Sequence, residues 1–348
     1  MKHTFLFTVI ACLFTAQSWA APTISSLTGT IGHNQLVTIS GSGFGNKAQA
    51  APQLWDTVDS QSAYSGLSDG STIPTGGSNP WGENYNNSTK YESSETQRHS
   101  QSSACYKATG TNTHIGGKTI PGSSVYIAWW WKPVVASPWT DYSTKILRAG
   151  NTGDDLGKTF SWTGMHHYVW TSSQGYCMNY PTCGGSAAWG TWKGNLNQWN
   201  LNEVYIDGPG RTYKLYVNGS LLASESWACC SSFDFNYVGL IGYNGSGVGE
   251  PSCTSYIDDV YIDNTQARVL IGNASTFAAS THREIQIPSA WSDSSITIKV
   301  NQGSFVKDNT AYLYVVDANG AVNSSGYPIT IESGAPAPSA PKGLHIVQ

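Results

Sequence analysis

The stretch LNEVYIDGPGRTYKLYVNG, residues 201–219, decides the fold class. Asn202–Asp207 and Tyr213–Val217 are short runs rich in β-branched and aromatic residues, and such runs predict two β-strands. Asn218-Gly219 predicts a hairpin turn after the second strand, because both central positions of a type I′ turn require positive φ. No segment of useful length carries the helical period, so this stretch indicates an all-β protein.

The same pattern recurs along the chain on both sides of this hairpin. Short runs of β-branched and aromatic residues, separated by Gly, Asn, Ser and Pro, are typical of β-sandwiches. In the middle of the chain we expect further strands at Val125–Lys132, Tyr142–Ala149, Phe160–Trp170, Tyr237–Tyr243 and Tyr256–Ile262. Beyond Ala267 we expect strands at Arg268–Ile271, Glu284–Ile287, Ile296–Val300, Ala311–Val316 and Ile329–Ile331.

Composition limits the possible functions. The chain has 18 Lys+Arg against 22 Asp+Glu, a net charge of -4, and charged residues make up only 11%. A protein that binds nucleic acid electrostatically needs a basic face, so that class is excluded. With 39% hydrophobic and 12% aromatic residues the chain has ample apolar surface to bury, which argues against disorder. No cofactor fingerprint is present.

The first twenty residues have the features of a secretory signal peptide. Lys2 is followed by the apolar run Phe5–Ala16, which is too short to span a bilayer, and then by small residues before Ala21. We therefore expect cleavage near Ala21 and a secreted protein, extracellular or periplasmic, with no membrane span.

The cysteines agree with export. One of the seven lies in the expected signal peptide, and the even number that remains favours disulfides in an oxidising compartment. Zinc-ligand spacing is absent. We expect the six to pair as Cys177 with Cys183, with the adjacent Cys229 and Cys230 reaching Cys105 and Cys253.

The two ends of the chain resemble parts of one domain. Residues 22–45, PTISSLTGTIGHNQLVTISGSGFG, look like the opening of an IPT/TIG immunoglobulin-like domain, and residues 267–331, including IQIPSAWSDSSITIKVNQG, are similar to the rest. The roughly 220 residues between them are too long for a loop, so we expect an inserted domain. The expected division is a signal peptide (1–20), the first part of the Ig-like domain (21–48), the insert (49–266), the second part of the Ig-like domain (267–332) and a Pro/Ala-rich tail (333–348).

The insert resembles the concanavalin A-like jelly roll shared by legume-type lectins, laminin-G-like modules and several polysaccharide lyases and hydrolases. The resemblance rests on LWDTVD at 54–59, VYIAWWWKP at 125–133 and the closing YIDDVYIDN at 256–264. It implies a fold that handles polysaccharide, although fold alone does not define function. It also implies a structural calcium that joins the opening and closing strands through Asp56, Asp258 and Asp259. The alternative is that these aspartates only cap turns.

Aromatic side chains are the candidates for sugar contact. Alternation within Phe160–Trp170 places several rings on one face of a strand, and an aromatic face suits the C–H patches of sugar rings. The alternative is that these rings are sandwich core. The residues expected to bind carbohydrate are Trp130, Tyr126, Trp139, Trp162, Trp170, Trp189 and Trp192.

Enzymatic activity is left open. A polysaccharide lyase needs a base beside the uronate carboxyl and cations to neutralise it, roles that His166 or Tyr168, with Lys145 or Arg148, would fill. A retaining hydrolase needs two carboxyls about 5 Å apart, and the sequence has no strand of alternating acids to provide them. Three functions follow: a secreted polysaccharide-binding protein, a polysaccharide lyase acting by β-elimination, and a structural or adhesive component contacting the cell surface or matrix.

Overall fold

The computed structural model describes residues 20–109, 113–134, 144–150, 159–167, 174–180, 186–226, 235–241 and 253–332. For residues 144–145, 159–167, 174–180, 186–191 and 240–241 it describes the backbone alone. Within these ranges the secondary structure is strand apart from one short 3-10 helix, η1 (Ser62–Tyr64), which confirms the predicted all-β class.

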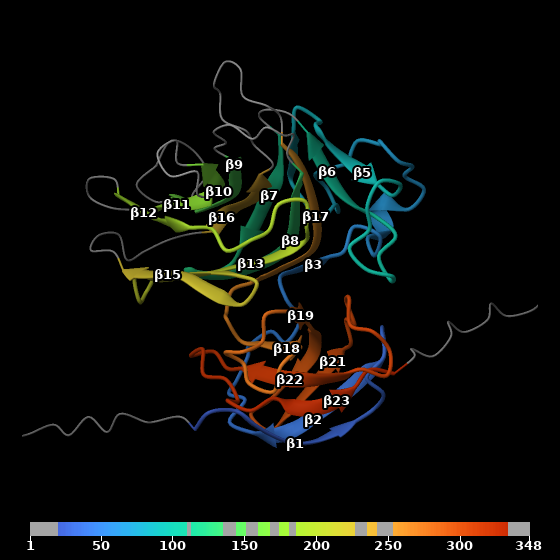
Figure 1. Ribbon diagram of the computed structural model, residues 1–348, viewed down its shortest axis with the longest axis vertical. Helices are drawn as coiled ribbons and strands as arrows, with labels where there is room; N and C mark the ends of the chain where they lie inside the picture. The colour runs from blue at the N-terminus through green and yellow to red at the C-terminus, as the bar shows by residue number, and fades with distance from the viewer. Residues whose placement is uncertain are drawn as a thin grey trace, which may run out of the picture.

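The middle of the chain forms the larger of two sandwiches, drawn from blue through green and yellow to orange-brown in Figure 1. Its seven-stranded sheet has the order β12 (Ser186–Thr191), β11 (Gln174–Tyr180), β10 (Thr159–His167), β9 (Thr144–Gly150), β16 (Phe235–Ile241), β7 (His114–Ile120), β4 (Glu83–Tyr85). Its eight-stranded sheet has the order β15 (Ser220–Ser226), β14 (Thr212–Val217), β13 (Asn200–Asp207), β8 (Ser124–Val134), β17 (Thr254–Asp263), β6 (Cys105–Thr109), β5 (Thr89–Glu92), with β3 (Leu54–Asp56) paired to β17.

The two ends of the chain together form the smaller sandwich, which joins blue and orange-red segments in Figure 1. One sheet has the order β1 (Thr23–Thr28), β2 (Leu36–Ser42), β21 (Ser295–Lys299), β20 (Ile287–Trp291). The other has the order β19 (Arg283–Ile285), β18 (Arg268–Gly272), β22 (Thr310–Val316), β23 (Tyr327–Thr330). The larger sandwich is therefore inserted in the chain of the smaller one.

The hairpin at residues 201–219 forms as its sequence predicts. Asn218 and Gly219 both have positive φ, 48° and 75°, and they join β14 to β15. The expected single strand Glu284–Ile287, in contrast, is two strands in different sheets, β19 and β20. The chain crosses between the sheets at Gln286, whose side chain donates to the carbonyls of Glu284 and Asn301, both at 2.9 Å, and so satisfies backbone groups at the crossing.

Strand β8 explains how the two sandwiches join. Its odd-numbered residues, such as Ile127 and Trp129, lie in the core of the larger sandwich. Its even-numbered residues pack against β18, β19 and β22 of the smaller sandwich, because successive side chains point to opposite faces of a sheet. Both faces of β8 are thus covered, which accounts for its continuous apolar sequence.

Buried ion pairs cross the same junction. Arg98 Nη1 lies 2.9 Å from Glu284 Oε1, and Lys47 Nζ lies 2.6 Å from Asp263 Oδ2, next to the points where the chain enters and leaves the larger sandwich. Breaking such a pair leaves an uncompensated buried charge, at a cost of about 3–5 kcal/mol. The junction is therefore an extension of both cores.

Candidate functional site

Three of the aromatic residues expected to bind sugar are buried. Tyr126 and Trp130 are only 2% and 5% exposed because the smaller sandwich covers their face of β8. Trp192 is 3% exposed and belongs to the core of the larger sandwich, where its ring packs on Trp131. These three residues do not form a sugar-binding surface, and the alternative that they are core is correct for them.

The other predicted sugar and lyase residues are placed only in part. Arg148 is exposed on β9, and its neighbours Leu147 and Ala149 face the core. The backbone alone is described for Lys145, Trp162, His166 and Trp189, on strands β9, β10 and β12 of the seven-stranded sheet. Outside the described residues lie Trp139, Tyr168 and Trp170.

The three aspartates expected to hold calcium each contact other protein groups. Asp56 accepts hydrogen bonds from Trp81 Nε1 at 2.8 Å and from Tyr106 Oη at 2.5 Å. Asp258 accepts from a serine hydroxyl, and burial, followed by the charge of Asp259, raises its pKa well above the ordinary value. Asp259 is paired with an arginine. No three His, Cys, Asp or Glu side chains of the described chain lie close enough to hold a metal ion. All three carboxylates are therefore engaged by protein groups, and the calcium site stays a prediction.

Of the six cysteines expected to form disulfides, the structure tests the pairing of Cys105. The thiol of Cys105 is buried without a disulfide, and its sulfur lies 3.7 Å from the carbonyl of Thr96, so the expected bond from Cys105 is not formed here. Cys253 is buried, and Cys177 is described by its backbone only. Outside the described residues lie Cys183, Cys229 and Cys230.

A polar and aromatic cluster lies on the outer face of the seven-stranded sheet, opposite its core. We call Glu83, Tyr85, His114, Arg148 and Tyr237 the sheet-face cluster. Glu83 Oε1 accepts a hydrogen bond from Tyr237 Oη at 2.6 Å and lies 2.7 Å from His114 Nε2. The sequence did not reveal this cluster, because Glu83 and Tyr237 are 154 residues apart and meet only through the strand order.

Two glycines set the position of Tyr237. A Cβ at either Gly116 or Gly239 would lie 2.7 Å from Tyr237 Oη, closer than real side-chain contacts allow. The ring therefore lies low across the sheet and reaches from β16 to Glu83 on β4. Gly239 pairs with Arg148 across β16 and β9, and paired residues share a face, so Arg148 lies beside this ring.

Tyr85 and His114 form the exposed end of the cluster. Their rings stack with centroids 4.8 Å apart and planes 15° from parallel. Tyr85 is 46% exposed, among the largest exposed fractions of any bulky hydrophobic side chain in the described residues. The stack fixes an aromatic face toward solvent beside the carboxylate of Glu83.

Burial and neighbouring groups set the protonation states of Glu83 and Tyr237 in the sheet-face cluster. Burial disfavours ionisation of Glu83, but its hydrogen bonds with Tyr237 and His114 and the charge of Arg148 outweigh burial and lower its pKa. Burial, then the hydrogen bond to Glu83, raises the pKa of Tyr237 well above the ordinary value. Near pH 7 the cluster therefore presents a carboxylate, a protonated phenol and an arginine.

Comparisons with known proteins give only distant likeness. No family model matches the sequence, and no curated protein matches it. Among solved structures, the botulinum neurotoxin type G receptor-binding domain is 11% identical with a TM-score of 0.33, over 67% of this chain and 71% of that one. The serotype D ligand-binding domain in complex with N-acetylneuraminic acid is 10% identical (TM-score 0.35, 65% and 66% covered). A sialidase is 9% identical with a TM-score of 0.36, and the match spans 67% of this chain but about a fifth of that one, 21%. Likeness at this level does not identify a function.

A search of the described residues finds no helix with the length and apolar character to cross a membrane.

Proposed function

We propose that the protein binds polysaccharide and that the sheet-face cluster is part of the binding surface. The observation that carries this proposal is the exposed Tyr85–His114 stack next to Glu83. An aromatic face attracts the C–H side of a sugar ring, and adjacent hydrogen-bonding groups orient its hydroxyls.

The cluster offers both kinds of hydrogen-bonding partner that a sugar hydroxyl uses. The Glu83 carboxylate accepts hydrogen bonds, and the Arg148 guanidinium donates them. Both contacts described to Glu83 use Oε1, so Oε2 accepts no hydrogen bond from the described residues. This oxygen is the natural acceptor for a sugar hydroxyl that lies over the Tyr85 ring.

Binding fits the described part of the cluster better than β-elimination. A lyase needs a base that takes a proton near the working pH. Tyr237 is a poor base because its raised pKa keeps it protonated there.

We also propose export to the medium or periplasm, where such glycans occur. The sequence of the exported chain, read from its N-terminus, should then begin near Ala21.

The proposal is tested with Tyr85→Ala and a panel of neutral and uronate-containing polysaccharides in affinity electrophoresis. Loss of one aromatic contact worth about 1 kcal/mol predicts roughly fivefold weaker binding. Leu221→Ala is the matched control, since Leu221 is similarly exposed, at 53% against 46% for Tyr85, but lies on β15 of the other sheet. It should bind like the unaltered protein.

Two results would contradict the proposal. Absence of binding across the panel would favour a structural or adhesive role. Release of an unsaturated uronate product, detected by ultraviolet absorbance and lost in His166→Ala, would assign a polysaccharide lyase instead.

A further inference from the structure

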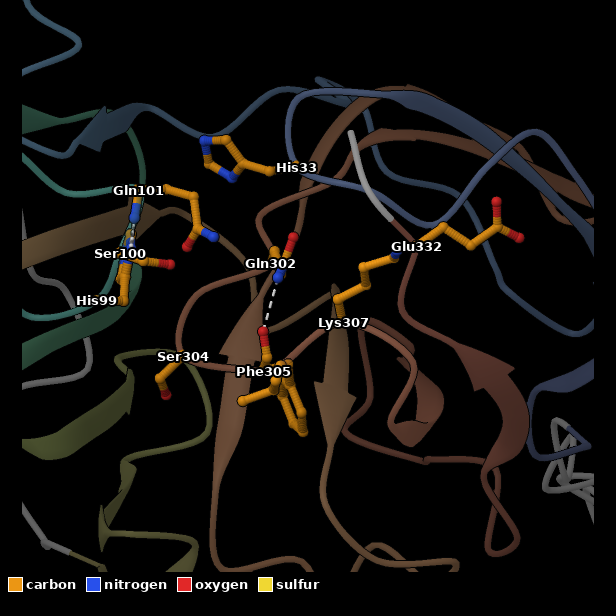
Figure 2. Close-up of a pocket in the computed structure, with 10 residues that line it drawn as sticks. His33, His99, Ser100, Gln101, Gln302, Ser304, Phe305, Lys307 and Glu332 are labelled. Carbon is orange, nitrogen blue, oxygen red and sulfur yellow. Dashed lines mark hydrogen bonds between the residues drawn. The ribbon is translucent and has the colours of Figure 1, made fainter. Parts of the chain in front are cut away.

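A polar cleft lies where the two sandwiches meet, away from the sheet-face cluster. It consists of two adjoining hollows of about 580 and 530 Å³ that share His33, His99 and Gln101. Figure 2 shows the first hollow, with His33 from the loop after β1, His99–Gln101 from the loop before β6, and Gln302–Lys307 from the loop after β21. Volumes of this size are typical of small-molecule sites.

Buried polar atoms around the second hollow lack partners. Among the described residues no hydrogen bond reaches His33 Nδ1, His99 Nε2, Gln101 Oε1 or Asp259 Oδ1, and all four residues line this hollow. The side chains of His99 and Asp259 are only 5% and 3% exposed. Their closest approach, from His99 Nε2 to Asp259 Oδ2, is 3.6 Å and too long for a hydrogen bond. Buried polar groups are normally satisfied by protein groups, ordered water or a ligand, so four such atoms around one hollow make it a candidate site for a polar ligand.

The fold holds Asp259 in place for this role. A register shift interrupts the pairing of β17 with β8 between Asp258 and Tyr261, and Asp259 has a φ of 48° within the strand. Its Oδ2 atom is taken by Arg98, and by Asn301 Nδ2 at 3.3 Å, which leaves Oδ1 for the hollow. Strained backbone of this kind is common at binding sites.

The unpartnered atoms define the chemistry of the ligand. His99 Nδ1 accepts the Gln101 backbone N–H at 3.2 Å, so the ring proton lies on Nε2 and needs an acceptor. Asp259 Oδ1 and Gln101 Oε1 need donors. An anion without hydrogens offers no donor, and a metal ion offers no acceptor and finds no cluster of ligands here among the described side chains. A hydroxyl group both donates and accepts, and two adjacent hydroxyls would bridge these atoms as water does.

The remaining lining suits a sugar or sugar alcohol. Trp55 lines the second hollow and Phe305 the first, which provides apolar surface for C–H groups. Burial lowers the pKa of His33, so its ring is neutral near pH 7 and can donate or accept.

We propose that this cleft is a second ligand site, which binds a small neutral polyhydroxylated molecule through a vicinal diol held by His99, Gln101 and Asp259. The site goes beyond the sheet-face cluster and does not depend on it. Residues of both sandwiches line it, so the ligand would contact both.

The experiment follows the imidazole NMR signals of the mature protein during titration with D-glucose, D-galactose, D-mannose and xylitol, which include cis and trans vicinal diols. We expect saturable shifts of His33 and His99 with at least one of them and none with sodium sulfate. Gln101→Ala and His33→Ala should weaken that binding about five- to tenfold, the effect of one lost hydrogen bond. Both side chains lie outside the ion pairs that join the sandwiches, so these variants should fold.

Tyr85→Ala separates this site from the sheet face. It should leave the titration unchanged, and the two cleft variants should keep normal polysaccharide affinity. The inference is overturned when neither histidine shifts with any of the four compounds, or when Gln101→Ala and His33→Ala bind as tightly as the unaltered protein.

Discussion

The position of the Tyr237 ring depends on the absence of a side chain at Gly239 beneath it. Gly239 leaves room for the ring, and the three atoms nearest to a new Cβ there all belong to the ring and hydroxyl of Tyr237. Gly239→Ala should therefore displace Tyr237 from Glu83 and weaken polysaccharide binding roughly fivefold, for about 1 kcal/mol of lost interaction. In a Tyr237→Ala background the same substitution should have no further effect. Equal losses in both backgrounds would show that Gly239 acts on something other than this ring.

Sequence patterns predicted strands but not the residues that meet across strands, because such contacts depend on the tertiary structure. The strand expected at Val125–Lys132 is confirmed, but a strand pattern carries no information about what covers the face that holds Tyr126 and Trp130. Glu83 and His114 gave no signal because a short strand with a single carboxylate is common, and their contact depends on which strands pair.

Strand β19 carries a fully buried carboxylate of the junction, that of Glu284. Glu284 accepts from both terminal nitrogens of Arg98, at 2.9 and 3.0 Å, and contacts His282 Nε2 at 2.9 Å. Burial alone would raise its pKa, but the Arg98 charge and the His282 contact outweigh burial and hold the pKa well below the ordinary value. A folded-state pKa below the unfolded one stabilises the fold above the unfolded pKa, and that stability is lost as the pH falls.

Glu284→Gln should lower the free energy of unfolding by about 3 kcal/mol at pH 7, because a buried arginine loses one of its partners. The difference from the unaltered protein should shrink as the pH falls below about 4.3, the ordinary glutamate value. Urea unfolding at a series of pH values measures it. Glu332→Gln, at an exposed position, is the control and should follow the unaltered protein throughout. A constant difference across the series would show that the Glu284 charge is not involved.

At the scale of the whole molecule, the two sandwiches are joined by a packed and charged junction. Trp130 packs on the Arg98 guanidinium, 4.6 Å from its ring centroid, and on the His282 ring at 5.1 Å. Trp130→Ala should cost about 3–5 kcal/mol and uncouple the sandwiches. Calorimetry should then show two unfolding transitions in place of one. One unchanged transition would mean that the junction does not couple them.

The sequence predicts the architecture better than the site. The Asn218-Gly219 turn and the strands beside it follow from local rules, and the structure confirms them. The length of the segment between the two Ig-like parts also indicated an insertion, because a segment that long must fold by itself. The sheet-face cluster depends on β4, β7 and β16, which lie far apart in the chain and adjoin only in the folded sheet.

The most direct test of the central claim is backbone NMR of the protein during addition of an oligosaccharide cut from the polysaccharide it binds best. The account predicts that the amide signals of β4, β7 and β16 shift most. Shifts confined to β13, β14 and β15, or an unchanged spectrum, would contradict it.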